Sequence, residues 1–553
     1  MVILKGTGVS EGIAFGRIFI NKPKNSKSEK IEIKDANEEI NRYKKAKKAT
    51  LDYTKRLYDQ VLKELGENEA EIFKAHEMMI NDPDFENSII GIITQEMANA
   101  EYAILKTSEI FSKIFLDMPD PYMKSRAMDV ADISNCMISE LSGKNSGESF
   151  GGLKGNVILA AEDFTPSEIT SANKEKVAGF LCSEGSAYSH SSILLRVMKI
   201  PGIVCVKGLE ESYSGKEAIF DGSSGEVYIE PERPVVDFFK NKKLFEERSE
   251  KLLEKLKGKA SVTLDGKKIK LCANMNNPDE IGAIAESDCD GIGLLRSEFI
   301  YLSAKELPTE EKQFEIYKNV LEKLKGKEVI IRTLDIGSDK KADYLNLPFE
   351  HNPAMGYRGI RICLDRPDIF KTQLRAIYRA SAYGNVSIMF PMITSLDEIK
   401  EIKKYIKEVK EELKNEGKKI CENVKIGVMI ETPAAVMISD ELAKEVDFFS
   451  IGTNDLTQYT LAVDRQNGKV SKMFDTHNKS VLRMIKKVTE NAHKNGITVG
   501  ICGESAADES LIETYLAIGI DELSMSAPFL LKVKKKILEI KISNIKNKVL
   551  NSI

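Results

Sequence analysis

Five short segments in the second half of this 553-residue chain place a charged, amide or thiol side chain directly after an apolar run. The side chains are Arg296 with Glu298, Arg332 with Asp335, Glu431, Asn454 with Asp455, and Cys502. Arginines bind phosphate and carboxylate groups through forked, charge-assisted hydrogen bonds. Carboxylates supply the oxygen ligands that Mg²⁺ prefers, and a thiol can act as an acid toward carbon. Together these residues predict a site for a small phosphorylated carboxylic acid beside a divalent cation.

The predicted roles differ between these residue types. The arginines are the candidate phosphate and carboxylate ligands: Arg296, Arg332, Arg358 and Arg465. Glu431 and Asp455 are the candidate Mg²⁺ ligands, with waters and substrate oxygens completing an octahedron. A single Arg or Glu at the end of a strand is more often an ion-pair residue, and a lone Cys is usually a small buried apolar residue. Such a side chain follows each of several successive apolar runs, and this regularity favours a substrate site.

His190 is one of only five histidines and lies in the segment SEGSAYSHSSILL. A turn rich in Gly, Ser and Ala leads there into an apolar segment that predicts a helix beginning near Ser191. The N–H groups at a helix N-terminus favour a phosphate, and a neutral imidazole can carry one as phosphohistidine. The alternative is a helix-capping or core histidine. The phosphate site predicted elsewhere in the chain favours the nucleophile.

The residues from Val262 onward alternate between apolar runs and helical stretches, a pattern that predicts parallel strands with helical crossovers. Eight units over this length are typical of a (β/α)₈ barrel, whose active sites lie at the carboxyl ends of the strands. The eight predicted strands are Ile269–Ala273, Gly291–Leu295, Val329–Leu334, Val386–Pro391, Ile426–Ile430, Phe448–Ile451, Thr498–Ile501 and Glu522–Met525.

The first half of the chain has two compositions. Val2 to Ile20 predicts two strands around a Gly-rich turn, and strand-like runs return from Asn156 to Ile229. Between them, apolar residues recur at helical spacing from Ile31 to Leu141, which predicts an all-helical insertion. We expect an α/β domain (1–20 with 144–230), a helical domain (21–143), a linker helix (231–259) and the barrel (260–553).

The helical insertion contains His76 beside Met78 and Met79. Methionine-rich surfaces are common where proteins dock, so these three residues are candidate partner contacts. A surface histidine of a helix, beside core methionines, is the competing interpretation.

The composition excludes several classes of protein. A formal net charge of −4 argues against nucleic acid as the main partner. The eight cysteines form no CxxC pair, which argues against zinc and favours a reducing compartment. The sequence has no signal-peptide pattern and no apolar run long enough for membrane insertion. We therefore expect a soluble cytoplasmic protein.

The motifs resemble those of the phosphoenolpyruvate-protein phosphotransferase family, the enzyme I proteins of the sugar phosphotransferase system. The likeness covers KGTGVSEGIAFG, DFTPSE, GIGLLRSEF, RTLDIGSDK, NPAMGYRGIR, IETP, GTNDLTQY, DRQN and ICGE. It implies a phosphohistidine-carrying, swivelling α/β domain with a helical insertion that docks the carrier HPr, followed by a TIM barrel that dimerises. It also implies that His190 is phosphorylated, that Arg296, Arg332, Asn454 and Arg465 bind phosphoenolpyruvate, that Glu431 and Asp455 hold Mg²⁺, and that Cys502 protonates the pyruvate enolate.

Several positions depart from the family pattern, namely Glu11, Tyr188, Ser338 and the pair Asn478-Lys479. They bear on rate and carrier choice more than on reaction type. Two other functions remain open. A phosphoenolpyruvate synthase or pyruvate dikinase shares the phosphohistidine and the barrel, although neither a P-loop nor spare length for a nucleotide-binding domain is present. A non-catalytic regulator could retain the fold, and a divergent paralogue could serve another HPr-like carrier.

Overall fold

The computed structural model describes the chain except residues 22–28, 65–66, 119–120, 144–154, 173–175, 187–188, 339, 341, 466 and 468. Tyr188 lies outside the described residues. The chain divides into two compact units, Met1–Arg248 and Ser249–Ile553. Helix α8 (Arg233–Glu254) spans the division and lies within the predicted linker helix (231–259). Within the described residues, no helix combines the length and the apolar character that a bilayer crossing needs.

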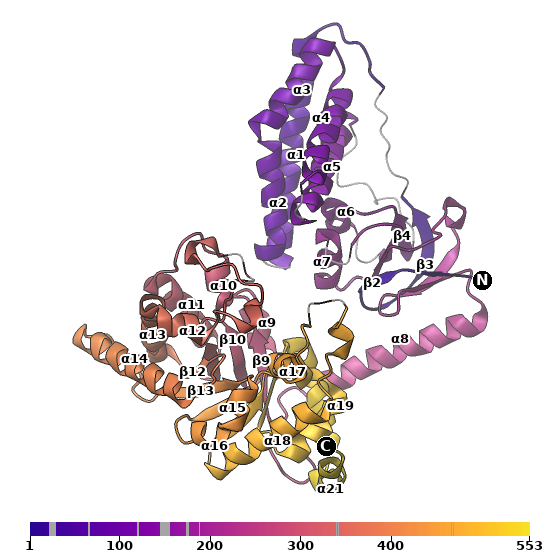
Figure 1. Cartoon of the computed structure of the whole chain (residues 1–553). Helices are drawn as coiled ribbons and strands as arrows, with labels where there is room; N and C mark the ends of the chain where they lie inside the picture. Colours follow the sequence, from indigo (N-terminus) through magenta and orange to yellow (C-terminus); the bar gives the residue numbers. More distant parts are fainter. Residues whose placement is uncertain are drawn as a thin grey trace. The chain divides into compact units, whose positions relative to one another are not determined.

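An eight-stranded sheet forms the base of the first unit, in the order β1-β8-β7-β3-β4-β5-β6-β2 (Figure 1). The N-terminal strands join it, as predicted. The strands are β1 (Val2–Lys5), β2 (Thr7–Ser10), β3 (Ile13–Ile20), β4 (Val157–Ala161), β5 (Val177–Cys182), β6 (Gly202–Val204), β7 (Glu217–Asp221) and β8 (Glu226–Ile229).

The prediction of two N-terminal strands was wrong, because the Gly-rich segment is itself strand β2. Glycine makes this strand possible. A Cβ on Gly8 would lie 2.0 Å from the carbonyl oxygen of Gly222, so only a residue without a side chain allows the two backbones to approach. The sequence signal that indicated a turn therefore marks a close backbone contact.

Five helices inserted between β3 and β4 form the predicted helical region, and Figure 1 shows them side by side. They are α1 (Ala36–Glu64), α2 (Glu67–Ile80), α3 (Pro83–Glu96), α4 (Ala100–Leu116) and α5 (Pro121–Leu141). Asp82 caps α3 by accepting hydrogen bonds from the N–H groups of Asp84 and Phe85. Tyr43, Ile89 and Ile133 belong to a buried core that joins these helices.

The second unit is a closed barrel of eight parallel strands, which confirms the predicted (β/α)₈ architecture. Helices lie on the outside of the strands (Figure 1). The strands are β9 (Lys270–Met275), β10 (Gly291–Arg296), β11 (Glu328–Arg332), β12 (Val386–Phe390), β13 (Lys425–Ile430), β14 (Phe448–Ile451), β15 (Thr498–Ile501) and β16 (Glu522–Met525). The helices are α9 (Glu280–Glu286), α10 (Glu298–Leu302), α11 (Glu310–Lys323), α12 (Ile360–Asp365), α13 (Pro367–Ala380), α14 (Leu396–Asn415), α15 (Pro433–Met437), α16 (Ser439–Leu442), α17 (Thr453–Leu461), α18 (Lys479–Lys494), α19 (Glu509–Ile518), α20 (Leu530–Glu539) and α21 (Ile542–Ser552).

Apolar side chains pack on both sides of the barrel strands. The larger core contains Ile331, Ile388 and Ile430 together with side chains of the surrounding helices. A separate cluster groups Leu294, Ile330, Met389, Met429 and Phe448 with Cys502. Burial on both faces explains why these strands appear in the sequence as continuous apolar runs rather than alternating ones.

Candidate active site

The carboxyl ends of the barrel strands bring most of the predicted residues to one face. Arg296 and Arg332 end β10 and β11, Glu431 directly follows β13, and Cys502 directly follows β15. Asn454 and Asp455 lie in the first turn of α17, just after β14. Because all eight strands are parallel, these positions share the face where barrel enzymes place their active sites.

Two carboxylates hold two of the arginines. The guanidinium of Arg332 donates to Glu298 at 3.0 Å and pairs with Asp335 at 3.0 Å. Arg358 donates from Nε and NH2 to Asp335 at 2.9 to 3.1 Å, and from NH1 to the hydroxyl of Tyr459 at 3.3 Å. The pair of guanidinium groups therefore has a fixed geometry.

Donors on two arginines remain without partners inside the barrel. The Nε atoms of Arg296 and Arg332 are buried and have no hydrogen-bond partner among the described residues. An unsatisfied buried donor costs about 1–3 kcal/mol, and more when the group is charged. A bound anion would satisfy both donors, so this part of the site suits a phosphate or a carboxylate.

Glu431 and Asp455 form the candidate cation site. Glu431 is 1 % exposed and accepts a hydrogen bond from the Met392 N–H at 2.7 Å. Burial raises the pKa of Glu431 to about 8, and the negative charges of Asp455 and Asp335 add to this shift. A Cβ on Gly452 would lie only 2.8 Å from Glu431 Oε2, so glycine leaves room for this carboxylate.

The ligand set fits a hard divalent cation. Two crowded carboxylates offer only oxygen, and a cation would relieve their mutual repulsion. The described part of the chain holds no group of three or more His, Cys, Asp or Glu side chains that could bind a metal. The remaining ligands would have to come from water and substrate, which is how Mg²⁺ is usually bound.

Cys502 is a buried thiol with 2 % exposure. Burial raises the pKa of the Cys502 thiol to about 11. A hydrogen bond with Ser450 lowers this pKa, and the negative charge of Glu431 raises it further. The thiol is therefore protonated at neutral pH and can donate a proton. Nearby, the Asn454 side chain donates to Glu504 at 3.1 Å, which fixes the amide beside the site.

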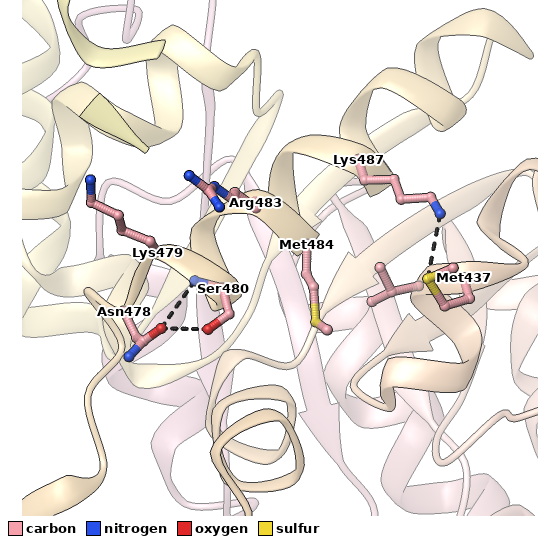
Figure 2. A pocket seen from close by; sticks show the side chains of 8 residues that line it. Met437, Asn478, Lys479, Ser480, Arg483, Met484 and Lys487 are labelled. Carbon is pink, nitrogen blue, oxygen red and sulfur yellow. Dashed lines mark hydrogen bonds between the residues drawn. The ribbon is translucent and has the colours of Figure 1, made fainter. Parts of the chain in front are cut away.

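Arg465 is not part of the buried network. It is exposed and follows the end of α17, and its backbone N–H donates to the side chain of Gln458 at 3.3 Å. A surface pocket of about 430 Å³ between α15 and α18 also lies apart from the predicted residues (Figure 2). Its lining includes Met437, Met484 and Lys487 but none of the candidate site residues.

His190 is the first residue of α7 (His190–Val197) in the first unit. Ser189 caps this helix by accepting a hydrogen bond from the Ser192 N–H at 3.2 Å. Burial lowers the pKa of the His190 imidazole. A lowered pKa keeps the ring neutral at pH 7, as a nucleophile toward phosphorus must be.

Charged residues of α5 that the sequence reasoning missed interact with His190. Asp129 raises the pKa of His190, whereas Arg126 and His76 lower it. Arg126 donates to Asp129 at 2.9 Å, and Asp132 accepts a hydrogen bond from the Ser167 N–H at 3.3 Å. The spacing of Arg126, Asp129 and Asp132, three residues apart on one side of α5, was the available signal.

The predicted docking residues are not equivalent. His76 is 1 % exposed, and its Nε2 lies 3.4 Å from Asp129, so the prediction that it contacts a partner at the surface was wrong. Met79 packs against the core of the helical region, whereas Met78 is 67 % exposed.

Apart from Tyr188, the positions that depart from the family pattern lie within the described residues. Ser338 donates a hydrogen bond to Glu350 at 3.4 Å, and Glu11 is exposed.

Comparisons with known proteins give one consistent result. Models described as "PEP-utilising enzyme" match in three parts: the N-terminal domain at residues 5–126, the mobile domain at 153–225 and the PEP-binding domain at 250–542. The phosphoenolpyruvate-protein phosphotransferase of Bacillus subtilis is 41% identical over 535 residues, 97% of this chain and 94% of that protein. Its namesake in Staphylococcus carnosus is 39% identical over 98% of this chain and 95% of that protein. A solution structure of Enzyme I (nEIt) is 32% identical, covers 44% of this chain and 99% of its own, and has a TM-score of 0.37.

Proposed function

This chain belongs to the phosphoenolpyruvate-protein phosphotransferase family, and from that premise we propose that it takes the phosphoryl group of phosphoenolpyruvate onto His190 and passes it to a carrier protein. The observation that carries the proposal is the pair of buried Nε donors, on Arg296 and Arg332 at the carboxyl end of the barrel, that have no hydrogen-bond partner among the described residues. Beside them lie two carboxylates suited to a cation and a protonated thiol suited to carbon.

The arginines bind the substrate in this proposal. Arg296, Arg332 and Arg358 satisfy their remaining donors on the phosphate and the carboxylate of phosphoenolpyruvate. Asn454 lies at the N-terminus of α17, where a negatively charged group is favoured. Arg465 is exposed in this structure and would have to turn inward to join them.

Glu431 and Asp455 would hold Mg²⁺. When bound there, the cation neutralises charge on the phosphate and on the leaving enolate oxygen. Glu431 is fixed by the Met392 N–H and has room beside Gly452, so one carboxylate is already in place.

The reaction then follows from the protonation states of two side chains. The neutral imidazole of His190 attacks phosphorus, the N–P bond forms, and the P–O bond to the enol oxygen breaks. The electron pair of the enolate takes the thiol proton of Cys502 at the methylene carbon, which gives pyruvate. The thiolate regains its proton from solvent before the next turnover.

The same imidazole must also reach a carrier such as HPr. We propose that the α/β region moves about the 231–259 segment between the two reactions. Met78 on α2 is the exposed member of the proposed docking set. The barrel is the proposed dimerisation domain. The eight cysteines, all free thiols, are consistent with the cytoplasmic location predicted from the sequence.

Incubation with phosphoenolpyruvate labelled in its phosphate, in the presence of Mg²⁺, tests the function. We expect an acid-labile label on the wild-type protein that a His190→Ala variant lacks and a His351→Ala control retains. Added HPr should then remove the label. A wild-type chain that acquires no label would favour a regulator, and labelled ATP formed when AMP and pyrophosphate are added would favour a dikinase.

A further inference from the structure

Asp335 is a buried carboxylate for which neither the predicted roles nor the proposed reaction provides a function. It directly follows Leu334 in the loop after β11 and is 3 % exposed. Its N–H donates to Glu298 at 3.1 Å. Gly359, with a left-handed φ of 59°, lies against it, because a Cβ there would be 3.1 Å from Asp335 Oδ1. The surrounding chain therefore leaves a defined space for this carboxylate.

The two oxygens of Asp335 contact both central arginines. Oδ2 lies 3.0 Å from Arg332 NH1 and 2.9 Å from Arg358 NH2, while Oδ1 accepts from Arg358 Nε at 3.1 Å. On the other side of Arg332, Glu298 takes NH2 at 3.0 Å.

These contacts determine which donors remain for a substrate. In Arg332, Nε is the donor without a hydrogen-bond partner among the described residues. Among the described residues, Arg358 NH1 donates only to the hydroxyl of Tyr459 at 3.3 Å. Its Nε and NH2 donate to Asp335, and NH2 also lies 3.6 Å from Asp455. The carboxylate thus sets the direction in which each guanidinium can still donate.

We propose that Asp335 is a positioning residue, which fixes Arg332 and Arg358 in one geometry so that both present their remaining donors to the anionic substrate. The inference rests on the proposed function and deepens it by assigning the device that orients the phosphoenolpyruvate site. Glu298, the first residue of α10, supports the same arrangement.

Two physical effects of Asp335 oppose each other, and their balance makes the proposal testable. Its negative charge repels an anionic substrate, so removing the charge alone would tighten binding. Its hydrogen bonds hold two long side chains, so removing them allows both guanidinium groups to move. A displacement of about 1 Å in a site can cost on the order of 100-fold in rate. The positioning role therefore predicts weaker binding in spite of the gain in positive charge.

The test variant is Asp335→Asn, which keeps the size of the side chain but removes its charge and one acceptor. Glu310→Gln is the matched control, because Glu310 also joins two arginines, Arg375 at 2.6 Å and Arg379 at 2.7 Å, between α11 and α13. Both variants are made in the full chain. Phosphoenolpyruvate binding is measured by calorimetry with Mg²⁺ present, and turnover is measured with HPr.

In the Asp335→Asn variant we expect the Kd and KM for phosphoenolpyruvate to rise at least tenfold, while the KM for HPr stays unchanged. The Glu310→Gln variant should match the wild type in all three constants. An Arg358→Lys variant that loses little more when Asp335→Asn is added would confirm that Asp335 acts through Arg358.

Three results would overturn the inference. The first is that Asp335→Asn binds phosphoenolpyruvate as tightly as the wild type or more tightly. The second is that Glu310→Gln loses as much affinity for phosphoenolpyruvate as Asp335→Asn does. The third is that the losses of affinity caused by Arg358→Lys and Asp335→Asn add fully when the two are combined. If Asp335→Asn does not fold, Glu298→Gln replaces it and is judged by the same constants. A wild-type chain that neither binds phosphoenolpyruvate nor acquires label overturns the proposed function as well, whereas wild-type binding with an unchanged variant overturns the inference alone.

Discussion

The Cys502→Ala substitution removes the proposed proton donor with little change in volume. With a pKa of about 11, roughly 3,000 thiols are protonated for every thiolate at pH 7.5, so nearly every molecule has its acid in place. A positioned acid contributes about 10²–10⁴-fold to a rate, and we expect pyruvate formation to slow by a factor in this range. Because the thiol stays protonated between pH 6 and 9, its titration should not lower the wild-type rate in this range. The rate should decline as the pH approaches 11.

The assay follows pyruvate release with saturating phosphoenolpyruvate, Mg²⁺ and HPr. Cys272→Ala is the control, since Cys272 is also buried in a barrel strand but lies in β9. Binding of phosphoenolpyruvate should be similar in both variants, because the thiol has no role in holding the substrate. A Cys502→Ala enzyme that turns over at a rate near that of the wild type, or a wild-type rate that falls around pH 8 to 9 because of this thiol, would refute the assignment.

Three further predictions concern the cation site and the His190 helix. Glu431 has a folded pKa of about 8 against 4.5 in the unfolded chain, so the unfolded state binds fewer protons and the stability of the metal-free barrel should fall from pH 5 to 8. Mg²⁺ and Glu431→Gln should each remove this trend in thermal unfolding, and a trend that persists in the variant would contradict the assignment. Gly452→Ala should reduce Mg²⁺-dependent turnover at least tenfold with little change in Tm, because its Cβ would displace Glu431; unchanged turnover would show that Glu431 can move without loss. Ser189→Ala should lower the free energy of unfolding of the first unit by about 1 kcal/mol in urea titrations through loss of the α7 cap, and no change would mean that the cap contributes nothing.

The barrel was predictable because its strands are buried on both faces. Each therefore appeared as an uninterrupted apolar run, and each polar side chain stood where a run ended. Arg296, Arg332, Glu431 and Cys502 could be placed on one face from this pattern alone. Strand β2 could not be predicted, because its glycine, Gly8, serves a backbone contact with Gly222, a residue distant in sequence.

The partners of the site residues were much less predictable than their positions. No spacing rule indicates that Asp335 holds Arg358 or that the charge of Asp129 acts on His190, because these interactions join elements that meet only in the folded chain. His76 shows the same limit. The neighbouring methionines suggested an exposed surface, yet the imidazole is buried beside Asp129. A helix in a bundle can bury a polar side chain where a charged residue of another helix pairs with it.

The order of strands in the first unit bears on how the chain folds during synthesis. Strand β1 pairs with β8 through Val2 and Ile229, and β3 pairs with both β4 and β7. Strand β1 therefore has no partner until residue 229 has been made, and β3 has none until β4 has been made, whereas the helices between β3 and β4 have mostly local contacts and can form earlier. Sheets closed by such long-range contacts fold slowly and expose apolar edges in the meantime. A chain truncated before β8 should keep the helical region folded but leave β1 unpaired and prone to aggregate.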